Sequence, residues 1–94
     1  MPFPKQNSLP FTQTSIESLN PNQIGVYGLH TANAWIYVGR GDIRTRLLSH
    51  LSGGNPSITA HGPTSFVTWV TPNDEAVEKA LIVELRPLAN QKVG

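Results

Sequence analysis

The sequence contains no cysteine. This absence excludes disulfide scaffolds, zinc sites with cysteine ligands, iron–sulfur clusters and thiolate catalysis. Long apolar runs are missing as well, since none approaches the roughly 18 residues that cross a bilayer. The N-terminus also lacks the charged and apolar segments of a secretory signal. We therefore expect a cytoplasmic protein with no membrane partner, whose chemistry uses Tyr, His, Arg, Asp, Glu, Ser, Thr or Lys side chains.

A strong excess of charge of either sign is missing too. The 94 residues include 7 Lys and Arg against 6 Asp and Glu, a net charge of +1. Such a balance gives no whole-molecule field of the kind that histone-like or membrane-coating proteins carry. Hydrophobic residues make up 38% of the chain, which is enough for one modest core, and the length is too small for two domains.

The beginning of the chain differs from the remainder. Four of the 8 prolines fall before residue 23, where apolar periodicity is weak. We therefore predict that residues 1–23 form an extended or mobile lead, with a single helical turn near Ser15–Leu19. The folded domain is predicted to span residues 24–94.

Two short runs rich in β-branched and aromatic residues follow, Ile24–Leu29 and Trp35–Val38. The polar residues 30–34 between them predict an antiparallel hairpin with a five-residue loop. A symmetric loop places Tyr27 directly opposite Tyr37, so both phenols project from one face of the sheet.

The remaining pattern predicts two helices and a third strand. Asp42 is a candidate N-cap for a helix over residues 42–52 that Gly53 ends, and Thr71 begins a capping box before a second helix. The residues from 52 to 64 read as a loop. We therefore predict an α+β fold, in which a small three-stranded antiparallel sheet packs with two or three helices. The predicted strands are residues 24–29, 35–39 and 65–70, and the predicted helices lie near 42–52 and 73–86.

Glu78 occupies an unusual place in the second predicted helix. At 100° per residue it falls inside the apolar sector that Leu81 and Leu85 define. Burying an unpaired carboxylate costs several kcal/mol. We therefore expect Glu78 to face a cation or strong hydrogen-bond donors, or to lie at the rim of a cleft.

Several residues suit phosphate chemistry, although each also has an ordinary structural explanation. Arg40, Arg44 and Arg46 form a short basic patch that suits nucleic-acid phosphates, and Arg46 shares one helix stripe with His50. Paired tyrosines often simply pack, and a basic helix edge is often only solvated. The three histidines, at positions 30, 50 and 61, lack metal-ligand spacing.

The combination of these residues is more specific than any one of them. Gly25-Val26-Tyr27 precedes Tyr37-Val38-Gly39, and an arginine follows inside the next predicted helix. Towards the C-terminus, Glu78 is followed by Leu81-Ile82, then Pro87, then Asn90. Both patterns, in this order, resemble the GIY-YIG nuclease family over about residues 24–91. The resemblance implies the same fold as the one predicted above.

The resemblance also implies roles for individual residues. Tyr27 and Tyr37 match the signature tyrosines, one acting as general base towards the attacking water and the other assisting at the scissile phosphate. Arg46 matches the helix arginine that neutralises developing charge on the phosphate. The segment between Gly39 and the helix is one residue shorter than is common in the family, which leaves Arg44 as an alternative; helix phase favours Arg46.

The remaining matches concern a metal ion and the site's surroundings. The resemblance implies that Glu78 is the single carboxylate ligand of one divalent cation, Mg²⁺ or Mn²⁺. A ligand role gives Glu78 a physical reason for its place, because a metal offsets the desolvation of the carboxylate. Asn90 matches a late asparagine that orients the site, and His50 lies where many members carry a histidine.

The sequence therefore predicts a metal-dependent endonuclease that hydrolyses DNA phosphodiester bonds. Because the net charge is small, we expect weak DNA binding, a branched, flapped or damaged substrate, or a protein partner that supplies targeting. One alternative is a non-catalytic nucleic-acid- or partner-binding module on the same scaffold. Another is an unrelated interaction domain in which Glu78 pairs with Arg46 or Arg86.

Overall fold

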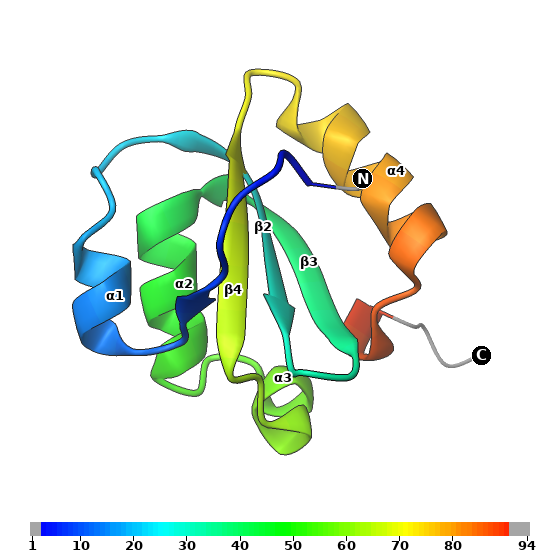
Figure 1. Ribbon diagram of the computed structural model, residues 1–94. Coiled ribbons are helices and arrows are strands. Elements are labelled where there is room, and N and C mark those ends of the chain that lie inside the picture. The colour runs from blue at the N-terminus through cyan, green and yellow to red at the C-terminus, as the bar shows by residue number, and fades with distance from the viewer. Residues whose placement is uncertain (1–2, 91–94) are drawn as a thin grey trace.

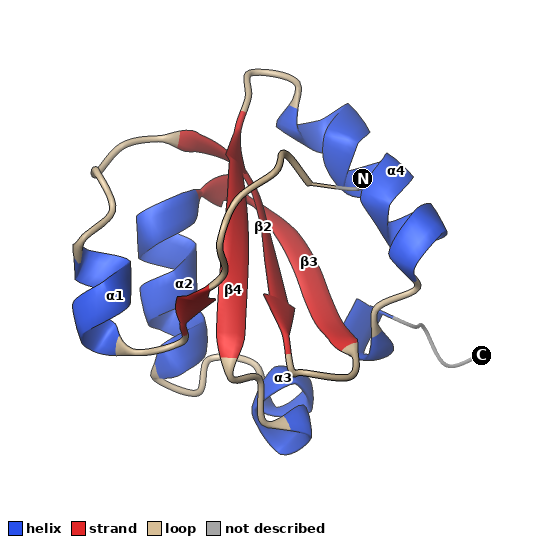
Figure 2. Cartoon of the chain, in the orientation of Figure 1, coloured by secondary structure: helices blue, strands red, loops and turns tan. Residues whose placement is uncertain are grey.

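The computed structural model describes residues 3–90 of the chain. Their strands and helices (Figures 1 and 2) follow in the order β1 (Leu9–Pro10), α1 (Gln13–Glu17), β2 (Ile24–His30), β3 (Trp35–Asp42), α2 (Ile43–Leu51), α3 (Pro56–His61), β4 (Ser65–Val70), α4 (Asp74–Leu85) and the 3₁₀ turn η1 (Leu88–Asn90). The strands form one antiparallel sheet in the order β1-β4-β2-β3. Within residues 3–90, no helix has both the length and the hydropathy to span a bilayer.

The sheet lies between two layers of helix. Helices α1 and α2 lie on one side and α4 on the other, while α3 lies beyond one end of the strands (Figure 1). The core accordingly has two parts. The part towards α1, α2 and α3 contains Ile16, Tyr27, Leu29, Ile36, Ile43, Leu47, Ile58 and Phe66. The part towards α4 contains Phe3, Val26, Val38, Val67 and Leu81.

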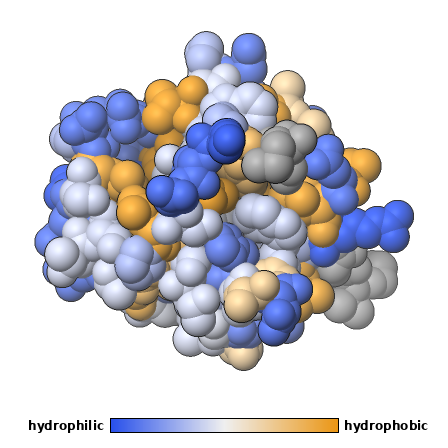
Figure 3. Space-filling model, viewed as in Figure 1, coloured by the Kyte–Doolittle hydropathy of each residue, from blue (hydrophilic) through white to orange (hydrophobic). Residues whose placement is uncertain are grey.

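The predicted α+β class is confirmed, with four strands in place of three. The additional strand is β1, which pairs with β4 through two residues only. Helix α2 follows its predicted start, since the Asp42 carboxylate accepts a hydrogen bond from the Thr45 backbone N–H. In the view of Figure 3, apolar side chains form several separate patches among hydrophilic ones.

The hairpin of β2 and β3 has a different register from the predicted one. Tyr27 pairs with Gly39, and Leu29 pairs with Tyr37. The pairing then shifts so that His30 meets Trp35, which leaves Ile36 as the extra residue of a β-bulge. The prediction that Tyr27 lies directly opposite Tyr37 is therefore wrong by two residues. A shift of two keeps both tyrosines on one face, and their ring centroids are 6.3 Å apart.

The N-terminal residues, expected as an extended or mobile lead, pack on the domain. Phe3 is buried and stacks on Trp35 with ring centroids 5.5 Å apart. Ile16, in the short helix α1, is fully buried against the other face. The Gln6 side-chain amide donates to the Thr68 carbonyl at 2.7 Å and accepts from its N–H at 3.0 Å. Burial of these apolar side chains explains why a proline-rich segment is held in place.

The segment predicted as a loop between residues 52 and 64 contains helix α3. Asn55 caps it by accepting a hydrogen bond from the Ser57 N–H, and Pro56 occupies the first turn. Gly62 ends it in the left-handed conformation with φ of 60°. Burial of Ile58 anchors this short helix to the core. The helix is too short to show a periodic apolar pattern in the sequence, although its capping residues are the usual ones.

The start of α4 also differs from the expected capping box. The Thr71 hydroxyl accepts from the Asn73 N–H, and Asn73 is the N-cap residue without a side-chain capping bond. The helix therefore begins at Asp74, two residues later than a Thr71 cap would place it. Its end fits the prediction, since Arg86 adopts a left-handed conformation with φ of 48° before Pro87.

Candidate active site

The two tyrosines contact a histidine on the face of the sheet that α2 covers. Tyr27 projects from β2 and Tyr37 from β3, and the ring of His50 on α2 packs against both, with centroid distances of 5.5 and 5.3 Å. The Tyr27 hydroxyl lies 2.6 Å from Nε2 of His50. Tyr27 is fully buried and His50 is 7% exposed, so this hydrogen bond is shielded from solvent.

Burial disfavours the charged form of both partners in that hydrogen bond. It raises the pKa of Tyr27 far above its ordinary value, with the neighbouring Tyr37 adding to the rise. Burial also lowers the pKa of His50, and the charge of Arg46 lowers it further. At neutral pH both groups are therefore uncharged, and the Tyr27 hydroxyl donates to Nε2 in the tautomer that carries the ring proton on Nδ1. Nδ1 of His50 then carries the ring proton and is buried without a hydrogen-bond partner among the described residues.

Gly39 makes room for the Tyr27 hydroxyl. It is the strand partner of Tyr27 on β3. A Cβ atom at this position would collide with the Tyr27 hydroxyl and would lie 2.8 Å from Cε2 of Tyr37. The glycine is thus needed because two aromatic side chains approach its backbone. This requirement explains the glycine that closes the Tyr37-Val38-Gly39 run.

Arg46 is the arginine that the fold brings to the tyrosines. Its side-chain carbons lie 3.6 and 3.8 Å from where a Gly41 Cβ would stand. Its positive charge opposes the rise in the pKa of both Tyr27 and Tyr37. Arg44, two residues earlier, instead has its Nε buried without a hydrogen-bond partner in the described part of the chain. The geometry therefore agrees with the helix-phase preference for Arg46.

Glu78 approaches the same site from α4. Its side chain is 22% exposed, and Oε1 lies 3.6 Å from Nε of Arg40. Burial raises the pKa of this carboxyl, while the Arg40 guanidinium opposes the rise. The Glu78 charge in turn raises the pKa of Tyr37, so the carboxylate and the phenol share one electrostatic environment. The expected cation is present, but it is Arg40, whereas the alternative prediction named Arg46 or Arg86.

Arg40 faces α4 because β3 ends beside the start of that helix. Its guanidinium lies 3.4 Å from the carboxylates of Asp74 and Glu75, in addition to its contact with Glu78. The predicted basic patch is therefore divided, with Arg40 facing acidic side chains and Arg46 facing the tyrosines. No sequence-local signal indicates this long-range grouping, which the prediction did not include.

Asn90 fixes the edge strand beside the tyrosines. Its Oδ1 accepts from the Val38 N–H at 2.7 Å, and its Nδ2 donates to the Val38 carbonyl at 3.0 Å. Val38 lies between Tyr37 and Gly39, so the two hydrogen bonds hold β3 in place at these two residues. Asn90 therefore holds the backbone of β3 beside Tyr37, and its role in orienting the site stays a prediction.

The donor set fits a metal ion held by one protein carboxylate. Among residues 3–90 there is no group of three or more His, Asp or Glu side chains that could hold a metal. Mg²⁺ is commonly bound through one or two carboxylates while it keeps several waters and takes substrate phosphate oxygens. Glu78, partly exposed beside the tyrosines, suits that mode and not a complete protein cage.

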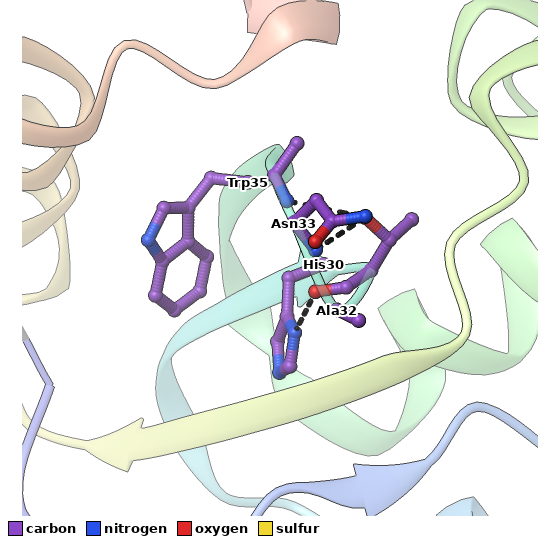
Figure 4. A pocket seen from close by; sticks show the side chains of 6 residues that line it. His30, Ala32, Asn33 and Trp35 are labelled. Carbon is purple, nitrogen blue, oxygen red and sulfur yellow. Dashed lines mark hydrogen bonds between the residues drawn. The ribbon is translucent and has the colours of Figure 1, made fainter.

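A separate hollow of about 270 Å³ lies at the hairpin turn and is lined by residues 30–35 (Figure 4). There Nδ1 of His30 lies 2.8 Å from the Thr31 carbonyl, and Nε2 lies 2.8 Å from the Ser8 hydroxyl. Both ring nitrogens are thus engaged in holding the turn and the N-terminal segment. His30 and exposed His61 take no part in the tyrosine site.

Comparison with known proteins decides the family through the fold. No protein-family profile matches the sequence, and no curated protein sequence does so either. The magnesium-bound GIY-YIG N-terminal endonuclease domain of UvrC from Thermotoga maritima is 26% identical, with a TM-score of 0.67 over 82% of this chain and 97% of that one. The chain is a GIY-YIG domain.

Further structures of the UvrC domain support the same assignment. A point mutant with a tyrosine replaced by phenylalanine, bound to its catalytic divalent cation, is 25% identical with a TM-score of 0.69 over 83% of this chain and 97% of that one. A mutant with an asparagine replaced by alanine, also bound to its catalytic cation, is 24% identical with a TM-score of 0.70 over the same shares. This GIY-YIG domain thus matches nearly the full length of the UvrC domain.

Proposed function

We propose that this GIY-YIG domain is a metal-dependent endonuclease that hydrolyses DNA phosphodiester bonds. The observation that carries the proposal is the Tyr27 hydroxyl held 2.6 Å from a neutral His50, with Arg46 and Glu78 acting on the same phenols. The likeness to the UvrC endonuclease domain with its catalytic divalent cation supports it.

Tyr27 and His50 together provide a base that neither provides alone. A buried phenol rarely ionises near neutral pH, because burial raises its pKa. The Tyr27 oxygen is fully buried in the free protein, so substrate binding must bring the attacking water to it. The oxygen can then take a proton from that water while its own proton passes to Nε2 of His50. The product of this transfer is a neutral phenol and a protonated imidazole, so no free phenolate is required.

Arg46 and Tyr37 act on the phosphate. Phosphodiester hydrolysis adds negative charge to the phosphoryl oxygens, and a guanidinium placed beside them stabilises that charge. Arg46 extends from α2 toward both phenols, and the half-buried Tyr37 hydroxyl can donate a hydrogen bond to the phosphate. Glu78 would hold one divalent cation, Mg²⁺ or Mn²⁺, which supplies a Lewis acid when bound.

The substrate class follows from the charge of the chain. With a net charge of +1, Arg40, Arg44 and Arg46 can contact few phosphates, so affinity for plain duplex is low. We therefore propose branched, flapped or damaged DNA as substrate, or a protein partner that delivers the domain to its target in the cytoplasm.

The test compares the protein with its Glu78→Ala and Tyr27→Phe variants on labelled branched, flapped and plain duplex DNA, with Mg²⁺, Mn²⁺ or EDTA. Glu84→Ala is the matched control, because Glu84 is an exposed carboxylate on the same helix. Metal-dependent cleavage by the protein and Glu84→Ala, lost in the other two folded variants, would support the proposal. Cleavage that persists in Glu78→Ala would contradict the metal assignment, and DNA binding without cleavage would indicate a non-catalytic module.

A further inference from the structure

Arg40 makes an unusual set of contacts for a cation beside the proposed metal ligand. Its three guanidinium nitrogens face three carboxylates on the first turns of α4: Nη1 lies 3.4 Å from Asp74, Nη2 3.4 Å from Glu75, and Nε 3.6 Å from Glu78. The residue stands on β3 only three positions after Tyr37, so it joins the signature strand to the helix that carries Glu78.

The three carboxylates are not equivalent. The side chains of Asp74 and Glu78 are 16% and 22% exposed, whereas that of Glu75 is 67% exposed. Arg40 itself is 42% exposed at the side chain, so it can turn without unpacking the core. If it leaves Glu78, it keeps two of its three carboxylate partners. The cost of that movement is therefore small compared with breaking an isolated pair.

A divalent cation and the Arg40 guanidinium both require the Glu78 carboxylate. Like charges a few ångströms apart repel strongly where solvent is partly excluded. The guanidinium contacts one carboxylate oxygen, Oε1, through Nε, its innermost nitrogen, at 3.6 Å. A metal ion on the same carboxylate would bring two cations within a few ångströms of each other, so we expect Arg40 to move away when the metal binds.

We propose that Arg40 is a positioning residue that competes with the divalent cation for Glu78, and that metal binding displaces it from Glu78 while its two outer nitrogens stay with Asp74 and Glu75. This inference rests on the proposed function, because it takes Glu78 as the metal ligand. It also implies reciprocal coupling, since whatever draws Arg40 away from Glu78 favours the metal.

The test measures binding of Mn²⁺ alone, by calorimetry and water-proton relaxation, to the protein and to Arg40→Gln. Removing the competing charge is expected to tighten Mn²⁺ binding by about fivefold or more. Lys79→Gln is the matched control, since it removes the same charge from an exposed position beside Glu78 in sequence; its affinity should stay within about twofold of the original protein. Arg40→Lys retains a charge and should bind Mn²⁺ less tightly than Arg40→Gln.

Two results would overturn the inference in distinguishable ways. If Glu78→Gln binds Mn²⁺ as well as the original protein, Glu78 is not the ligand and the metal assignment fails together with the inference. If Glu78→Gln loses binding but Arg40→Gln binds Mn²⁺ no more tightly than Lys79→Gln, the ligand assignment stands and the competition alone is wrong. Circular dichroism establishes that each variant is folded.

Discussion

The Tyr27 hydroxyl and Nε2 of His50 are joined by a buried 2.6 Å hydrogen bond between β2 and α2. The bond links two neutral groups because burial disfavours the charged form of each. A phenol in this position has one proton acceptor next to it, and that acceptor is uncharged at neutral pH. This pairing makes the ionisation of Tyr27 alone unnecessary for base catalysis.

Replacing Tyr27 by Phe removes the hydroxyl and leaves Nε2 of His50 buried without its partner. We expect single-turnover DNA cleavage to fall by about 100-fold or more, and the free energy of unfolding to fall by about 1–3 kcal/mol. Denaturant titration and single-turnover kinetics measure the two effects. If the residues act as one unit, His50→Gln and the double variant should lose about as much activity as Tyr27→Phe. Fully additive losses would contradict the pairing.

Protonation of His50 sets the acid limit of cleavage. Its pKa lies below the ordinary value of 6.5 in the folded protein, and the protonated ring cannot accept from Tyr27. Cleavage should therefore rise with pH with a midpoint below pH 6.5, as measured by a pH–rate profile under single-turnover conditions. An acid limb whose midpoint lies above 6.5 would contradict this assignment.

The same shift affects stability, with a defined sign. The unfolded chain binds the His50 proton more readily than the fold does, so the free energy of unfolding rises with pH through the interval up to about 6.5. This contribution to stability is fully present above the pKa of His50 in the unfolded chain. It is lost as the pH falls toward the lower pKa of His50 in the folded protein. In thermal denaturation between pH 5 and 7.5, the melting temperature should depend less steeply on pH for His50→Gln than for the control His61→Gln.

Placing a methyl group on Gly39 forces the tyrosines apart. Gly39→Ala should destabilise the fold by about 1–3 kcal/mol through overpacking and should lower cleavage further than the stability change explains. The measurement is a denaturant titration together with single-turnover kinetics. In a Tyr27→Leu background the alanine should cost less stability, because both the Tyr27 hydroxyl and the ring carbon Cζ, which would lie 2.5 Å from the new methyl group, are gone. An equal cost in both backgrounds would show that the collision is not the cause.

Removing the Asn90 amide opens the edge of β3. Asn90→Ala loses two hydrogen bonds to Val38, so we expect a destabilisation of about 1–3 kcal/mol. Amide hydrogen exchange at Val38 should accelerate. Asn33→Ala, at an exposed turn position where only the backbone N–H is bonded, should change stability by less than about 0.5 kcal/mol. Unchanged exchange at Val38 would contradict the orienting role.

Phe3 makes the first residues part of the fold. Phe3→Ala should destabilise the protein by about 3 kcal/mol, because the buried ring stacks on Trp35 and fills the α4 side of the core. Tryptophan fluorescence should report the loss of stacking. The exposed neighbour Pro4 offers the control Pro4→Ala, which should leave the core intact. If Phe3→Ala changed stability only slightly, the prediction of an extended or mobile N-terminal lead would stand instead.

Local pattern was sufficient for the central elements of the fold. The runs at residues 24–29 and 35–38 and the capped helix after Asp42 carry their own periodicity and end signals, and they lie where they were predicted. By contrast, β1 has two exposed residues, and its formation depends on β4, which follows more than fifty residues later. A pairing of this kind leaves no local signal.

The candidate site was predictable in residue type and only partly in geometry. The spacing of Tyr27 and Tyr37 indicates a common face, but the bulge at Ile36 changes which residues are opposed. The helical wheel indicates that Glu78 faces a cation or strong hydrogen-bond donors, or lies at the rim of a cleft. It cannot identify Arg40, because that pair joins β3 to α4 across a long sequence separation.

Two strands of the sheet are each closed by a primary amide where no further strand pairs with them, β4 by Gln6 at Thr68 and β3 by Asn90 at Val38. Primary amides hydrolyse slowly as a protein ages. Deamidation of Asn90 would replace the donating Nδ2 by a carboxylate oxygen that faces the Val38 carbonyl, which turns one attraction into a repulsion. Slow deamidation of Asn90 would therefore loosen β3 beside Tyr37 as the protein ages.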